Sequence, residues 1–343
     1  MADPNPSPDL LTFQTMYLCG VAYEADPALM PALIEKTQVP PTGGNWRCLW
    51  GPAQDSDESN LAFVAGYYTA TSAAPEFICV TIRGTDVDVS DIWGILEQIW
   101  EDIDGADPQP MPWALDDPAR VASGTLDGLT VIQELTDPTS GQTLSQFLTE
   151  LYLQPANANV KTVVTGHSLG GCLATIVAMW IRVLLPNIQG VIQPITWAAP
   201  TAGNCEFATY YSELFPTARR FQNTLDIIPK ALQHLGDIDD VYANNDLSAP
   251  SFVEFCIRGM MDLMSDNGAT YMQPSQGAQI LTGNFLTCDQ GDWYAQALHQ
   301  HHLATYLSVL TGQPLDETAL PKSTAPRARN RRRSRAVASS ATR

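Results

Sequence analysis

The sequence predicts an α/β fold with a largely parallel central sheet flanked by helices. Three observations predict it. Strand-like and helix-like segments alternate along the chain, a β-branched run at 160–164 leads through a glycine-rich turn into a long apolar segment, and 45% of the 343 residues are hydrophobic. A chain of this size can bury a sizeable core. We expect a single domain over residues 1–320, followed by a disordered, arginine-rich tail over residues 321–343.

The first half of the chain is expected to begin with helix and continue with strands. Residues 8–35 have a helical pattern with a break near Asp26-Pro27. Residues 60–70 and 76–84 are rich in β-branched and aromatic side chains, which favours strands joined by the loop "TSAAP". Two segments rich in Pro, Gly and Trp, at 43–52 and 107–118, are expected to be loops that either line a substrate entrance or are simple insertions.

The second half continues the alternation. Residues 160–164 are typical of a buried strand, and residues 169–185 are apolar on all sides, which predicts a buried helix. Residues 293–312 predict one long helix that Gly312 closes before Pro314. The other elements expected here are a helix at 142–153, a strand at 190–200, a helix at 206–215 and a strand at 218–223.

The charge of the chain is divided unevenly. The net charge is −19, yet residues 321–343 contain eight Lys or Arg and no acid, so residues 1–320 carry ten bases against 37 acids. A body this acidic should repel nucleic acid and anionic membranes, and its substrates are expected to be neutral or zwitterionic. The cluster Arg331-Arg332-Arg333 could contact nucleic acid or anionic lipid, but a solvated tail is the preferred interpretation.

Targeting and metal-binding signals are not visible. The N-terminal "MADPNPSPDLL" has no basic region followed by an apolar stretch, and no window is long and apolar enough for a membrane span, so a cytoplasmic location is expected by default. The seven cysteines are widely scattered with no metal-ligand or redox spacing, which fits reduced thiols.

The stretch "VVTGHSLGGCLA" has the pattern of a nucleophile elbow. A serine whose hydroxyl stands clear above a sheet needs a sharp turn between strand and helix, and Ser168 lies in that context. Side chains two residues before and after would collide there, so Gly166 and Gly170 are expected because they lack Cβ atoms. The alternative is a tight structural turn without catalysis.

The chain resembles the class 3 lipases, an α/β-hydrolase family that includes fungal triacylglycerol lipases. The resemblance covers about residues 80–310, and four stretches match in the family's order. They are "CVTIRGT" at 79–85, "VTGHSLGG" at 164–171, "ITWAAPTAGN" at 195–204 and "RRFQNTLDIIPKAL" at 219–232. The resemblance implies the α/β-hydrolase fold and serine ester hydrolysis.

Serine hydrolysis needs a base and a carboxylate that orients it. The fold's order of Ser, Asp and His makes Asp226 the expected acid, although a helix cap or a surface loop residue would also fit there. The family often places its histidine five residues before a Tyr-Leu pair, which favours His301, with His302 second. His234 is too close to Asp226 in sequence, and His299 is expected to be an exposed helix residue.

An oxyanion needs hydrogen-bond donors. The backbone N–H of Leu169, at the start of the predicted helix, is one expected donor. The resemblance implies Thr85 as the second and a structural role for His167. After Thr85, apolar residues spaced by three or four predict an amphipathic helix at 90–103, which is either a lid over the site or, preferably, a core helix.

The expected function is that of a serine carboxylic-ester hydrolase with the triad Ser168, His301 and Asp226. This chemistry requires no metal or organic cofactor. The expected partner is a neutral lipid or another ester, met through transient contact at a lipid interface, and no nucleic-acid partner is expected. Alternatives are a phospholipase A1-like enzyme, a polyester-type esterase, or a hydrolase-like protein that binds partners without catalysis.

Overall fold

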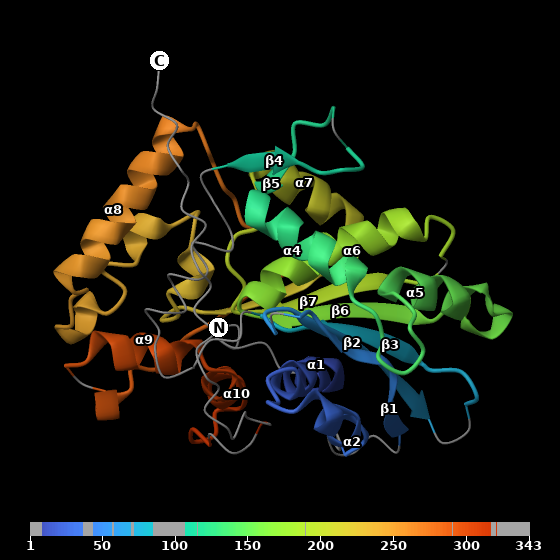
Figure 1. The fold of residues 1–343 in the computed structure, drawn as a ribbon. Helices are drawn as coiled ribbons and strands as arrows, with labels where there is room; N and C mark the ends of the chain where they lie inside the picture. Colours follow the sequence, from blue (N-terminus) through green and yellow to red (C-terminus); the bar gives the residue numbers. More distant parts are fainter. Residues whose placement is uncertain are drawn as a thin grey trace.

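A mixed seven-stranded sheet forms the centre of the computed structural model (Figure 1). The structure describes residues 9–36, 44–56, 58–69, 72–84, 107–114, 116–188, 190–289, 291–316 and 320. The strands lie in the order β1-β2-β3-β6-β7-β8-β9. Their bounds are Gly44–Gln54 (β1), Leu61–Thr69 (β2), Phe77–Ile82 (β3), Lys161–His167 (β6), Ile192–Trp197 (β7), Arg219–Asn223 (β8) and Ala278–Leu281 (β9).

The sheet is antiparallel at one edge and parallel elsewhere. β1 and β2 pair antiparallel, as do β2 and β3, whereas β3, β6, β7, β8 and β9 run parallel to one another. The carboxyl ends of parallel strands meet at one edge, which is where ligands bind in such sheets. The predicted α/β fold with a largely parallel sheet and flanking helices is confirmed.

Helices cover both faces of the sheet. In Figure 1, α1 (Leu10–Val21), α2 (Met30–Glu35) and α10 (Leu303–Thr311) lie on one face, and the core beneath them includes Val163. The adjacent residue Val164 enters the core of the other face, as expected for alternation along a strand. That face carries α4 (Ser123–Glu134), α5 (Leu144–Leu153), α6 (Leu169–Leu184) and α7 (Cys205–Leu214).

Further elements lie in connections and towards the C-terminus. β4 and β5 form a separate two-stranded antiparallel sheet. The bounds are Pro108–Pro110 (β4), Arg120–Ala122 (β5), Ser251–Asp266 (α8) and Trp293–His301 (α9), with 3-10 turns at Pro27–Leu29, Pro155–Asn157, Ile228–Lys230, Leu235–Asp237, Ala243–Asn245 and Thr287–Asp289. In the described part of the chain, no helix is long and apolar enough to cross a membrane.

Three predicted segments differ from the structure. Residues 107–118 were expected to be a loop, but Pro108–Pro110 pairs with β5 as strand β4. Residues 43–52 were expected to be a loop, but from Gly44 onward they belong to β1, whose register shifts near Trp50 accommodate Gly51 and Pro52 inside an edge strand. The single helix expected at 293–312 is two helices, because His302 has an extended backbone between α9 and α10. The segments 85–106 and 321–343, with the expected amphipathic helix and tail, lie outside the described residues.

Candidate active site

Ser168 lies in a strained turn between β6 and α6. Its backbone has φ 59° and ψ −133°, a conformation that residues other than glycine rarely adopt. A Cβ on Gly166 would lie 2.1 Å from the backbone oxygen of Gly170, and one on Gly170 would lie 2.4 Å from that of Ile82. Glycine is therefore required at both positions, two residues before and two residues after Ser168.

Asp226 lies in the loop that follows β8, at the same edge of the sheet. Its side chain is fully buried, and its charge is met by several donors. The backbone N–H of Ile228 donates to Oδ1 over 2.9 Å, and the hydroxyl of Tyr306 donates to Oδ2 over 2.7 Å. Burial and the neighbouring Asp226 raise the pKa of Tyr306 well above 10, so this hydroxyl keeps its proton and remains a donor.

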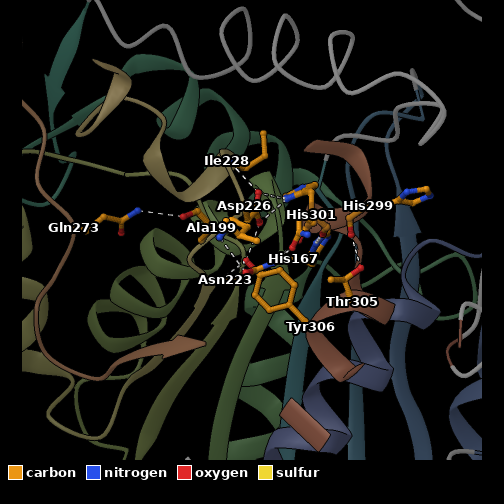
Figure 2. Close-up of polar contacts among 12 residues, drawn as sticks. His167, Ala199, Asn223, Asp226, Ile228, Gln273, His299, His301, Thr305 and Tyr306 are labelled. Carbon is orange, nitrogen blue, oxygen red and sulfur yellow. Dashed lines mark hydrogen bonds and ion pairs between the residues drawn. The ribbon is translucent and has the colours of Figure 1, made fainter. Parts of the chain in front are cut away.

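His301, the last residue of α9, contacts Asp226. Its Nδ1 lies 3.0 Å from Oδ2 and 3.2 Å from Oδ1, and Figure 2 shows the imidazole beside the carboxylate. A carboxylate only accepts hydrogen bonds, so Nδ1 carries the proton and Nε2 of the neutral ring has a free lone pair. Among the described residues, Nε2 of His301 has no hydrogen-bond partner although it is buried. That atom is chemically suited to accept a proton from a nucleophile.

The other candidate histidines lie elsewhere. His302 is half-buried in the turn between α9 and α10, and its ring centroid lies 5.7 Å from that of His299. His299 was expected to be exposed, but it is half-buried and its Nδ1 lies 2.5 Å from Oδ2 of Asp289. The acid of this second His–Asp pair, Asp289, lies in the 3-10 turn Thr287–Asp289 before α9, whereas Asp226 follows β8. Asp289 has no recognisable signal in the sequence.

His167 connects the elbow to the base. Its Nε2 lies 2.9 Å from the backbone oxygen of His301, and its Nδ1 lies 3.2 Å from the hydroxyl of Tyr23. A carbonyl only accepts, so Nε2 donates and Nδ1 accepts from Tyr23. Burial, followed by the proximity of His301, lowers the pKa of His167 well below 6.5, which keeps the ring neutral. The structure thus gives His167 a positioning contact with the residue that bears the base.

A buried amide network supports the same region. The side chain of Asn223 donates to Oε1 of Gln300 over 2.6 Å, and Nε2 of Gln300 donates to Oε1 of Gln296 over 2.8 Å. The backbone N–H of Asn223 donates to the hydroxyl of Tyr306 over 3.0 Å. The sequence analysis did not identify these residues. Gln296 and Gln300 lie four residues apart on one face of a helix, and two glutamines on an otherwise apolar face indicate a buried hydrogen-bond network.

The first turn of α6 lies directly beside Ser168. Leu169 begins α6, so its N–H belongs to the first turn, whose donors have no partner within the helix. Gly84 packs directly on this turn, because a Cβ there would lie 2.8 Å from the backbone oxygen of His167 and 2.9 Å from the nitrogen of Gly170. Thr85, the second expected donor, lies outside the described residues. Within the described part of the chain, no cluster of His, Cys, Asp or Glu could hold a metal ion.

Comparisons with known proteins find similarity to lipases. Residues 79–235 match the model of the family described as "Lipase (class 3)". The crystal structure of M37 lipase is similar over 88% of this chain and 92% of its own, with a TM-score of 0.73 and 25% identity. Lipase II from Rhizopus niveus aligns over 64% of this chain and 72% of its own at 17% identity, with a TM-score of 0.45.

A curated relative matches a shorter segment. Lipase ZK262.3 of Caenorhabditis elegans is 36% identical over 73 residues, which is 21% of this chain and 20% of that protein. The match thus spans about a fifth of the relative's length. The family match covers Ser168 and Asp226 but ends before His301, whose place beside Asp226 comes from the structure alone.

Proposed function

Because this chain belongs to the class 3 lipase family, we propose that it is a serine carboxylic-ester hydrolase that cleaves acyl esters of neutral lipids. The observation that carries the proposal is the pairing of His301 with Asp226, which leaves a buried, unpartnered Nε2 on the same sheet edge as the strained Ser168. A neutral imidazole with its other nitrogen held by a carboxylate is what serine activation requires.

In the proposed mechanism, Ser168 is the nucleophile. His301 takes the hydroxyl proton on Nε2 while Oγ of Ser168 attacks the ester carbonyl, and Asp226 stabilises the imidazolium that forms. The N–H of Leu169, together with Thr85, stabilises the oxyanion of the tetrahedral intermediate. His301 then gives the proton to the leaving alcohol, and an acyl-enzyme forms. Water, deprotonated by His301, releases the acid and restores the hydroxyl.

The substrate class is inferred from charge. With a net charge of −19, the protein is expected to disfavour anionic esters, so triacylglycerols or shorter neutral esters are the first choice. A zwitterionic phospholipid ester is the second choice, and a polyester is the third. The pairing of His301 with Asp226 supports this proposal over the non-catalytic alternative.

A chain-length series tests this proposal. Hydrolysis of p-nitrophenyl esters from C2 to C16 should require Ser168, so Ser168→Ala should lose activity while Ser275→Ala, an exposed loop serine, keeps it. A maximum at long chains would support a lipase, and activity confined to short chains would support an esterase. Activity retained by Ser168→Ala would overturn the proposed mechanism.

A further inference from the structure

A short segment between α8 and β9 contacts two of the loops around the proposed site. It runs from Tyr271 to Pro274, and we call it the 271–274 strap. Its end residues, Tyr271 and Pro274, are buried, whereas Met272 is 41% exposed, so the strap lies at the surface and is fixed at both ends. The strap is outside residues 79–235, the region matched by the family model.

On one side the strap contacts the loop after β7. The backbone N–H of Met272 donates to the oxygen of Gly203 over 2.8 Å, and Nε2 of Gln273 donates to the oxygen of Ala199 over 3.1 Å (Figure 2). Ala199 in turn packs on the first turn of α6, because a Cβ on Gly171 would lie 2.8 Å from that of Ala199. The strap is therefore one residue away from the helix that follows the proposed nucleophile.

On the other side the strap contacts the loop that carries Asp226. Oε1 of Gln233 accepts a hydrogen bond from the backbone N–H of Gln273 over 2.5 Å. Nε2 of Gln273 also donates to the backbone oxygen of Pro229 over a longer distance of 3.4 Å. Pro229 follows Ile228, whose N–H donates to Asp226. One side-chain amide thus faces backbone carbonyls of both loops.

Both loops contain a residue in a strained backbone conformation. Five described residues other than glycine have a positive φ, and three of them lie in turns and loops at this edge of the sheet. They are Ser168 at 59°, Ala198 at 52° and Leu232 at 71°. Such conformations are unfavourable and persist only where the surrounding contacts hold them in place.

The strap holds the residue that follows each strained position in these two loops. Ala199 follows Ala198 and accepts a hydrogen bond from the side chain of Gln273. Gln233 follows Leu232 and accepts a hydrogen bond from the backbone N–H of the same strap residue. Gln273 is therefore placed to hold both strained loops at a fixed separation.

We propose that Gln273 is a positioning residue that fixes the loop bearing Asp226 against the turn bearing Ser168, and so places the carboxylate for the proposed base. The inference rests on the proposed function, because this placement affects turnover only if these residues act together. A direct backbone hydrogen bond between the two loops, from Thr201 to Ala231, is 3.4 Å long, so the shorter hydrogen bonds of the strap supply the tighter link. Without the amide the loops can relax, and small displacements of reacting groups lower turnover.

Gln273→Met tests the proposal, because methionine has a similar length but no hydrogen-bond donor. Titration with a fluorophosphonate counts the active sites, so that kcat refers to folded, functional protein only. On p-nitrophenyl acetate we expect kcat per titrated site to fall about tenfold or more. KM should stay within about twofold, since the residue does not contact the substrate.

The matched control is Gln193→Met. Gln193 is 4% exposed and its amide donates to the backbone oxygen of Thr217 over 2.7 Å. It lies at the start of β7, at the edge of the sheet opposite the proposed site. The control loses a comparable buried hydrogen bond, so its stability should fall while its kcat per titrated site stays at the parental value.

A second variant gives the prediction a sign. In Gln273→Glu an ionised carboxylate faces two carbonyl oxygens, and it can donate a hydrogen bond only when it is protonated. The ratio of the variant's kcat to the parent's should therefore rise as the pH falls from about 8 to about 5. A ratio that does not change with pH would contradict the proposal. Unchanged kcat in Gln273→Met, or equal losses in Gln273→Met and Gln193→Met, would overturn it.

Proton NMR separates this proposal from the proposed function. The Nδ1 proton of His301, which Asp226 accepts, should give a strongly deshielded resonance that His301→Gln identifies by its loss. The resonance should shift or broaden in Gln273→Met and stay in place in Gln193→Met. If the parent hydrolyses no ester but the resonance responds in this way, the catalytic proposal fails and the positioning by Gln273 stands. If the parent hydrolyses the ester and Gln273→Met changes neither kcat nor the resonance, the positioning proposal fails alone.

Discussion

The imidazole Nε2 of His167 lies 2.9 Å from the backbone oxygen of His301. The residue before the proposed nucleophile thus contacts the backbone of the proposed base, across 134 positions of sequence. The two rings also lie close, with centroids 4.6 Å apart (Figure 2). His301 is the last residue of α9, and the last backbone carbonyls of a helix have no hydrogen-bond partner within the helix. The hydrogen bond from His167 therefore satisfies the carbonyl of His301 and holds in place the end of the helix that carries the proposed base.

A neutral, buried His167 predicts a pH-dependent stability. Burial lowers the pKa of His167 in the folded protein below its ordinary value of 6.5. At pH values between these two pKa values, His167 binds more protons in the unfolded state than in the folded state. The neutral ring therefore contributes fully to the free energy of unfolding above pH 6.5. This free energy decreases as the pH falls below 6.5, by up to about 1.4 kcal/mol per pH unit. Urea unfolding at pH 7.5, 6 and 5 should show a shallower decline in His167→Gln. Equal declines in both proteins would contradict the assignment.

Removing the hydroxyl that donates to Asp226 should affect turnover. Tyr306→Phe loses the 2.7 Å hydrogen bond to the carboxylate, and bonds to charged groups contribute about 1.5–3 kcal/mol. We expect kcat to fall at least about tenfold. The control is Tyr242→Phe, which loses a hydrogen bond of 2.9 Å to the backbone of Leu225. Steady-state kinetics on a soluble ester should show a large loss in kcat for Tyr306→Phe alone, and equal losses would favour a merely structural role.

The two His–Asp pairs should respond differently to the same substitution. Asp226→Asn replaces an acceptor by a group that can donate, which favours the wrong tautomer of His301 and should lower kcat on the order of 10⁴-fold. Asp289→Asn makes the same change beside His299 and should leave kcat within about threefold, since Asp289 pairs with His299 rather than with His301. A larger loss in Asp289→Asn would place the base at His299.

The elbow should not accept a methyl group. In Gly166→Ala the new Cβ would meet the backbone of Gly170 at 2.1 Å, so the turn must shift, at a cost of about 3 kcal/mol or more in the free energy of unfolding. Gly236→Ala, where the nearest atom lies 3.9 Å away, should change stability by less than about 1 kcal/mol. Chemical denaturation of both variants measures this, and a stable Gly166→Ala would show that the turn is not as tight as described.

Local signals made the sheet and the elbow predictable. The strand at Lys161–His167, the sharp turn and the helix from Leu169 follow from β-branched residues, two glycines and an apolar run that ends before Pro186. The contact between Asp226 and His301 was also expected, but from a resemblance rather than from local chemistry. These residues are 75 positions apart, and only the packing of α9 against the end of β8 brings them together.

Other features depend on tertiary structure that no local pattern encodes. β1 contains Gly51 and Pro52, which normally interrupt strands, and forms because an edge position and register shifts tolerate them. The turn at His302 separates α9 from α10 without glycine or proline, so periodicity alone predicted one helix. The pairing of His299 with Asp289 was missed because His299 was expected to be an exposed helix residue.

The most direct test of the central claim is covalent labelling of Ser168. A fluorophosphonate probe reacts with a serine only when a base activates its hydroxyl, and mass spectrometry locates the modified residue. We predict a single stoichiometric label on Ser168 in the native protein, none in Ser168→Ala, and a loss of labelling rate in His301→Gln but not in His299→Gln. An unlabelled Ser168 in folded protein, or labelling that persists at the native rate in His301→Gln, would contradict the account.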